Sequence, residues 1–81
     1  MNEEMEQEVQ KYRDKGIVVE QELIDYLIWY CHRKMEVAKV ENRDEYLPLL
    51  FKDELKNHFT RLAINATTML RMMGEEVPTV V

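Results

Sequence analysis

An 81-residue chain with a net charge of −5 is long enough for one small domain. It contains one cysteine and no dense cluster of cysteine and histidine, so an internal disulfide is excluded and a structural zinc site has no support. Domains of this size bury only about 60 % of their unfolded surface, and we therefore expect a partner or a second copy of the chain, most simply a homodimer, to supply further stability.

The start of the sequence, MNEEMEQEVQ, is acidic and lacks the apolar core of a signal peptide. The longest apolar stretch, residues 23–31, contains Asp25 and is too short to cross a bilayer. We therefore expect a cytoplasmic protein without a membrane partner. The negative charge is concentrated in the first 30 residues, which disfavours contact with nucleic acid or anionic lipid.

Apolar residues recur at spacings of three and four along the chain, without the alternation that a half-buried strand needs. The pattern predicts an all-α fold, a small antiparallel bundle of three helices in which the second and third form the main hairpin. Residues 1–74 are expected to form the domain, and residues 75–81 a flexible C-terminal tail.

The first helix is predicted over residues 2–15. Asn2 fits its N-cap and Gly16 the left-handed position after its last turn, where Ile17 would pack on Tyr12 in a Schellman ending. Its buried face is predicted to be a narrow stripe: Met5, Val9 and Tyr12.

The second helix is predicted over residues 20–40. Val19 occupies the expected N-cap without a side-chain oxygen, and Val18 is expected to be the buried valine that packs on Leu23. An apolar arc of about 200° makes this helix central, covered from at least two sides. The arc contains Tyr26, Val37, Tyr30, Leu23, Leu27, Ala38, Cys31, Ile24, Met35 and Ile28.

The third helix is predicted over residues 48–73, because Pro48 fits a first helical position. Asn42 with Glu45 could also start a short turn of helix before it. At about 39 Å it is long for so small a molecule. Its expected core face is Phe51, Leu55, His58, Phe59, Leu62, Ala66, Met69, Leu70 and Met73. A weaker stripe on the opposite side contains Leu50, Asn57, Ile64, Thr68 and Met72.

The polar residues and Cys31 raise two possibilities, catalysis and metal binding. Cys31 lies within the apolar arc and His32 points about 100° away from it, so Cys31 is expected to be a buried structural residue and no catalytic residue is predicted. Asp25, His32 and Glu36 share one helical face and Glu54 and His58 another, but the Glu-x-x-His spacing of di-metal bundles is absent. No metal ligand and no cofactor is therefore predicted.

Nucleic-acid binding would need basic side chains gathered on one surface, and here they scatter around two helices among acids. They are Arg33, Lys34, Lys39, Lys52, Lys56, Arg61 and Arg71. If these basic residues meet on one face, a nucleic-acid-binding regulator is the alternative function. If Asp25, His32, Glu54 and His58 converge, a metal-binding helical protein is a further alternative.

The sequence favours a non-catalytic protein-interaction module, a small regulatory or inhibitory adaptor of the type that phages and mobile elements also encode. Trp29 and Arg33 fall on the polar side of the second helix, and tryptophan and arginine are common interface anchors. The alternative is that the first helix or residues 41–47 cover Trp29. The predicted partner interface is Trp29, Arg33, Ile64, Thr68 and Met72.

Overall fold

The computed structural model describes residues 2–74, which contain three helices. They are α1 (Glu3–Asp14), α2 (Gln21–Val37) and α3 (Arg43–Met72), and no strand occurs within this range. The all-helical prediction is confirmed, whereas the predicted tail, residues 75–81, lies outside the described range. None of the described helices combines the length and the apolar character needed to span a membrane.

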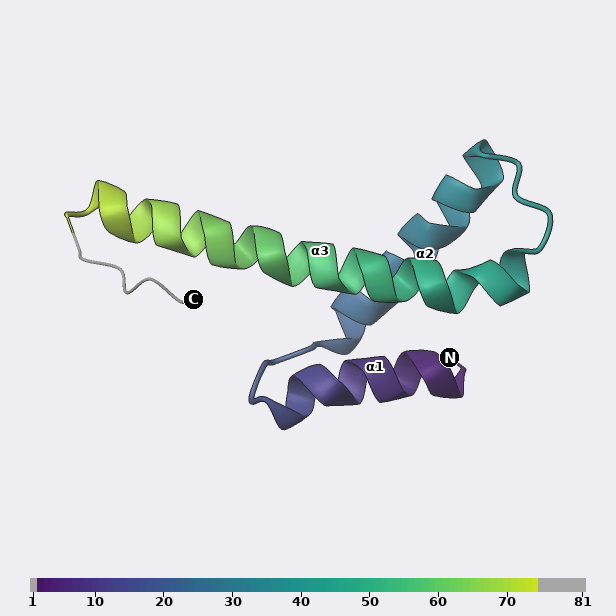
Figure 1. Cartoon of the computed structure of the whole chain (residues 1–81), viewed down its shortest axis with the longest axis horizontal. Helices are drawn as coiled ribbons and strands as arrows, with labels where there is room; N and C mark the ends of the chain where they lie inside the picture. The colour runs from purple at the N-terminus through teal and green to yellow at the C-terminus, as the bar shows by residue number, and fades with distance from the viewer. Residues whose placement is uncertain (1, 75–81) are drawn as a thin grey trace.

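The three helices do not run side by side along their whole length. In Figure 1, α2 crosses α3 obliquely and α1 lies along the first part of α3, while the second part of α3 projects beyond both. The most extensive contacts join α2 to α3, followed by those between α1 and α3. At 1.5 Å per residue, the 30 residues of α3 span about 45 Å, close to the 48 Å of the longest molecular dimension.

Both ends of α1 follow the predicted local chemistry. The Asn2 side chain accepts a hydrogen bond from the backbone N–H of Met5 at 3.0 Å, which caps the helix. Gly16 has a φ of +83°. Its N–H donates to the Arg13 carbonyl at 2.9 Å, and the Ile17 N–H donates to the Tyr12 carbonyl at 3.1 Å, the paired bonds of a Schellman ending.

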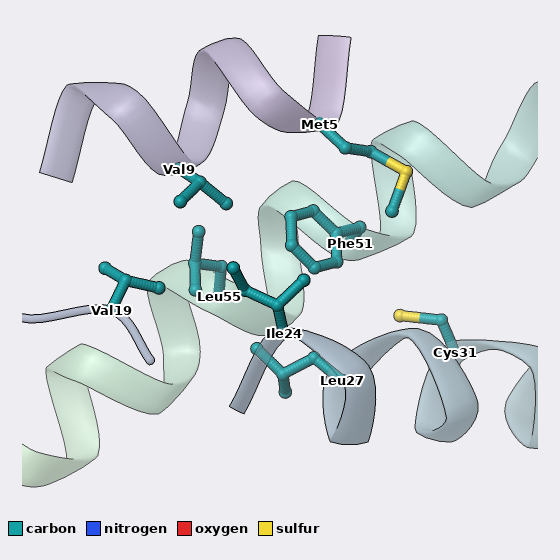
Figure 2. Packing of buried hydrophobic residues seen from close by; sticks show 8 residues of the cluster. All are labelled: Met5, Val9, Val19, Ile24, Leu27, Cys31, Phe51 and Leu55. Atoms are coloured by element: carbon teal, nitrogen blue, oxygen red, sulfur yellow. The ribbon is translucent and has the colours of Figure 1, made fainter. Parts of the chain in front are cut away.

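The core lies where the three helices meet (Figure 2), and its members come from every element and from the α1–α2 connection. It consists of Met5, Val9, Val19, Ile24, Leu27, Cys31, Phe51 and Leu55. The tilted packing of the Tyr12 ring of α1 against the Phe59 ring of α3, with centroids 5.0 Å apart, extends this contact toward the middle of α3.

The predicted start of α2 is wrong by one residue. Glu20 is the N-cap, without a side-chain cap bond; Val19 is 3 % exposed and Val18 is 77 % exposed. Val19 and Ile24 therefore occupy the two positions of a hydrophobic staple. The Arg13 guanidinium also donates to the Val19 carbonyl at 2.7 Å, which fixes the chain on its way into α2.

The predicted start of α3 at Pro48 is also wrong: the short helical turn that Asn42 with Glu45 could start is continuous with the helix, which begins at Arg43. Asn42 is the N-cap, and Pro48 lies buried inside the second turn. A proline in a helix lacks the N–H that would bond four residues back. Here that loss affects one bond near the N-terminus, and burial of the proline ring offsets it.

The predicted core faces of α2 and α3 extend too far. On α2, the residues Tyr26, Val37 and Ala38 are exposed. On α3 the exposed residues are Leu62, Ala66, Met69, Leu70 and Met73. The reason is geometric: α2 has 17 residues and crosses α3, so it leaves the second part of α3 uncovered.

Candidate interaction surfaces

The projecting part of α3, residues 60–72, has no buried residue, and we call it the α3 overhang. Leu55 is the last fully buried residue of the helix, and His58 and Phe59 are half-buried. At 1.5 Å per residue the overhang is about 20 Å long. Because its apolar side chains have no neighbour within the described chain that covers them, the overhang is the first candidate for a binding surface.

Two apolar stripes run along the overhang, and at 100° per residue their centres lie about 130° apart around the helix. The first, which we call the front stripe, continues the core face of Phe51 and Leu55 and consists of Leu62, Ala66, Met69 and Met73, the last being the C-cap residue. The second, the rear stripe, is the one predicted from the sequence to face a partner: Ile64, Thr68 and Met72, all exposed.

A groove of about 340 Å³ lies at the base of the overhang, and we call it the His58 groove. It is lined by Val18, Glu20, Leu23, His58, Phe59 and Leu62. Since Leu62 belongs both to this groove and to the front stripe, the groove and the stripe form one continuous surface. The ring of His58 lies edge-on to that of Phe59, with centroids 5.3 Å apart, and this packing holds one wall of the groove.

A second groove, of about 570 Å³, opens between the end of α2 and the start of α3, and we call it the Tyr46 groove. Its lining is mostly apolar and comprises Arg33, Lys34, Met35, Val37, Ala38, Val40, Tyr46 and Leu50. It exists because α2 diverges from α3 toward its C-terminal end. Val37 and Ala38 were predicted to lie in the core, so the sequence did not indicate this groove.

Trp29 and Arg33, the two interface residues predicted on α2, are exposed. Trp29 is 58 % exposed and packs along its own helix against Tyr26, with ring centroids 6.0 Å apart. Arg33 forms an exposed ion pair with Glu36 at 3.5 Å and lines the Tyr46 groove. These two residues and the rear stripe lie on different helices, so the five predicted interface residues do not form one cluster along a single element.

One buried polar cluster joins α2 to α3. Glu54 is 6 % exposed, and its carboxylate accepts a hydrogen bond from Lys34 Nζ at 2.8 Å. This hydrogen bond raises the pKa of Lys34, whose ammonium also lies 5.2 Å from the centre of the Tyr30 ring. Burial, with a smaller contribution from Glu54, raises the pKa of the Cys31 thiol to about 11. The predicted burial of Cys31 is confirmed, and its thiol stays protonated at neutral pH.

The side chains considered for a metal are separated by these contacts. Glu54 is engaged with Lys34, and His58 packs on Phe59. Within residues 2–74, no three side chains of histidine, cysteine, aspartate or glutamate gather closely enough to hold a metal ion. Of the basic residues considered for nucleic acid, Arg33 and Lys34 are paired with acids. No observation therefore favours either alternative over protein binding.

Comparisons of the chain with protein-family models, with curated proteins and with solved structures gave no match.

Proposed function

We propose that this chain is a small non-catalytic protein-interaction module, a regulatory or inhibitory adaptor that acts by binding another polypeptide. The observation that carries the proposal is the α3 overhang, where Met69 is 63 % and Met72 is 83 % exposed. Monomeric proteins rarely expose a continuous apolar surface that is not an interaction site.

Helix stability supports the same proposal. The overhang propagates from the packed first part of α3, and without buried contacts of its own it depends on the helix propensity of its residues. It contains residues of lower helix propensity, among them Thr60, Ile64, Asn65, Thr67 and Thr68. Packing against a partner would supply the stabilisation that these residues do not provide.

The chemistry of Cys31 supports the non-catalytic part of the proposal. A cysteine nucleophile reacts as the thiolate, which a low pKa and solvent access favour. Cys31 is fully buried, and its pKa is raised to about 11. Both features oppose a reactive thiolate and agree with a residue that fills the core.

A photo-crosslinking experiment in a lysate of the native host tests the proposal. The crosslinking residue replaces Met69 or Met72 in the overhang, and Glu4, an exposed position on α1, in a control chain. We expect discrete crosslinked products containing a second polypeptide from the two overhang positions and none from the control. Equal products at all three positions, or none at any, would contradict the proposal.

A further inference from the structure

We propose that the Tyr46 groove is a binding site for a small amphiphilic carboxylate, whose alkyl chain lies in the groove and whose carboxylate binds the Arg33 guanidinium. The inference goes beyond the proposed function, because the groove lies at the start of α3 and the overhang at its end. Both surfaces can be occupied at the same time, and either proposal can fail without the other.

The composition of the groove selects an anion with an apolar body. Among the described residues that line it, the charged ones are the two cations Arg33 and Lys34, and no acid occurs. Residues 33–40 carry three bases and one acid, in a chain with a net charge of −5. Sites for small molecules are typically apolar, with a few polar groups that fix the orientation of the ligand. The apolar lining residues are Met35, Val37, Ala38, Val40 and Leu50.

Arg33, and not Lys34, is the cation that is available to a ligand. Lys34 Nζ donates to the buried carboxylate of Glu54 at 2.8 Å, so its charge is already paired. Arg33 lies 3.5 Å from Glu36, and both of these side chains are more than half exposed. Such an exposed ion pair contributes little stability and exchanges readily. The guanidinium has five N–H donors and matches a carboxylate with two parallel hydrogen bonds.

Hydrogen bonds hold the wall of the groove that follows α2. The Val40 N–H donates to the Met35 carbonyl at 3.0 Å and the Lys39 N–H to the Glu36 carbonyl at 3.2 Å, the paired bonds of a Schellman ending. Arg43 Nε donates to the Val40 carbonyl at 3.1 Å. These bonds fix Val40 against the end of α2. The groove is therefore formed before a ligand arrives, and binding requires little further ordering.

The backbone of Lys39 places another cation next to the lining. Its φ is +55°, the left-handed conformation for which glycine is the usual residue at this point of a Schellman ending. A residue with a side chain in this conformation costs conformational energy, and such residues cluster at ligand sites. Lys39 lies between Ala38 and Val40, which both line the groove. Its positive charge adds to the local attraction of an anion.

The dimensions of the groove favour a small molecule over a docked helix. Its volume of about 570 Å³ lies within the range of about 300–1,000 Å³ that is typical of small-molecule sites. The lining runs from Arg33 to Val37 within α2 and from Tyr46 to Leu50 within α3, which is about 6 Å along each helix. A helix that docks through residues i, i+3, i+4 and i+7 needs about 10 Å. A short alkyl chain fits within the available length.

Titration of the purified full chain with decanoate, below its critical micelle concentration, tests the site. We expect saturable shifts of the amide resonances of Val37, Val40 and Tyr46 in NMR spectra, with a Kd on the order of 1 mM or tighter. From octanoate to dodecanoate, each further buried methylene should lower Kd by up to about fourfold.

Decylammonium, which has the same alkyl chain and the opposite charge, tests the selection of an anion. It should bind at least about tenfold more weakly than decanoate. The net charge of −5 attracts the cation to the chain as a whole. A preference for the carboxylate must therefore arise at the groove.

Two matched pairs of variants locate the site. Arg33→Gln should raise the Kd of decanoate at least about fivefold, whereas Arg61→Gln removes the same charge from an exposed position on the overhang and should leave it unchanged. Val37→Asp should raise the Kd at least about tenfold, because it places a carboxylate in the apolar lining. Val18→Asp is its control, since Val18 is 77 % and Val37 is 73 % exposed. Circular dichroism checks that each variant folds.

Three results would overturn the inference. One is the absence of saturable shifts around the groove, and another is binding of decylammonium that equals or exceeds that of decanoate. The third is binding lost in Val18→Asp but kept in Val37→Asp, because the His58 groove would then be the site. If decanoate does not bind while a crosslinking residue at Val37 captures a second polypeptide in the lysate, the groove belongs to a protein interface. The crosslinks at the overhang test the proposed function separately in every case.

Discussion

The two valines before α2 provide a sensitive test of the start of that helix. Val19 is 3 % exposed and Val18 is 77 % exposed. Full burial of a valine side chain stabilises a fold by about 1.5–3 kcal/mol. We therefore expect Val19→Ser to lower the free energy of unfolding by about 2 kcal/mol, and Val18→Ser to change it by less than about 0.5 kcal/mol.

Substitution of the neighbouring Glu20 by aspartate should instead raise the free energy of unfolding. Its backbone has the extended conformation of an N-cap, with φ −78° and ψ 150°, but its side chain makes no cap bond. Glu20→Asp keeps the charge and places the carboxylate within reach of the first free N–H groups. A good cap is typically worth about 1 kcal/mol, which corresponds to a rise of roughly 4–8 °C in Tm for a domain of this size.

Thermal and urea unfolding of the three variants, at one low micromolar concentration, measures these effects. The concentration is kept low so that self-association does not contribute to the comparison. A loss with Val18→Ser that exceeds the loss with Val19→Ser would refute the reasoning. It would mean that α2 begins one residue earlier and that Val18, not Val19, forms the staple.

Three further predictions concern the core and the first cap. Burial raises the pKa of the Cys31 thiol from 9.0 to about 11, so the thiol ionises at lower pH in the unfolded chain than in the native one. The free energy of unfolding should therefore fall between pH 9 and pH 11, by up to about 1.4 kcal/mol per pH unit. Cys31→Ala should lack this component, and an equal slope in both proteins would count against the prediction. Lys34→Met should lower the free energy of unfolding by about 1–3 kcal/mol, because it leaves the buried Glu54 carboxylate without its partner. Adding Glu54→Gln should restore part of that loss. A double-mutant cycle that shows no coupling energy would disprove the link between the two residues. Asn2→Ala should lower the free energy of unfolding by about 1 kcal/mol, because it removes the cap on the Met5 N–H. The loss should appear as a lower midpoint of urea unfolding. An unchanged midpoint would mean that the cap contributes nothing in solution.

The sequence analysis succeeded where local chemistry determines the structure. The cap of α1 and its Schellman ending depend on Asn2 and Gly16, and both were predicted from residue type and position. The burial of Cys31 followed from its place in the apolar arc of α2. These features need only neighbours within a few residues, which the order of amino acids specifies directly.

Errors arose where two local explanations compete. Val18 and Val19 are chemically identical, so only the position of the N-cap decides which one is buried. Pro48 fits both a first helical turn and a slightly later position, and burial of its ring within the longer helix decides between them. In both cases tertiary packing determines the outcome, and periodicity alone does not specify it.

The overhang shows what an apolar pattern leaves open. The stripe from Phe51 to Met73 predicts a face that needs cover, but it does not say which molecule covers it. Phe51 and Leu55 are covered within the chain, whereas Leu62 and Met69 are not. The length of the third helix could have indicated this exposure, because a helix much longer than the first two extends past its neighbours. From the sequence alone, the front stripe was therefore predicted to lie in the core and the rear stripe at the interface.

Native-state amide hydrogen exchange across residues 60–72, compared between the purified chain and its complex with the polypeptide that crosslinks at Met69 or Met72, tests the central claim most directly. We predict that these amides exchange rapidly in the chain alone and become protected in the complex, while amides around Leu27 and Phe51 stay protected in both. Equally slow exchange with and without the partner would contradict the claim, because the overhang would then be stable without cover. Rapid exchange of residues 60–72 in the complex would contradict it as well, because the partner would then bind elsewhere.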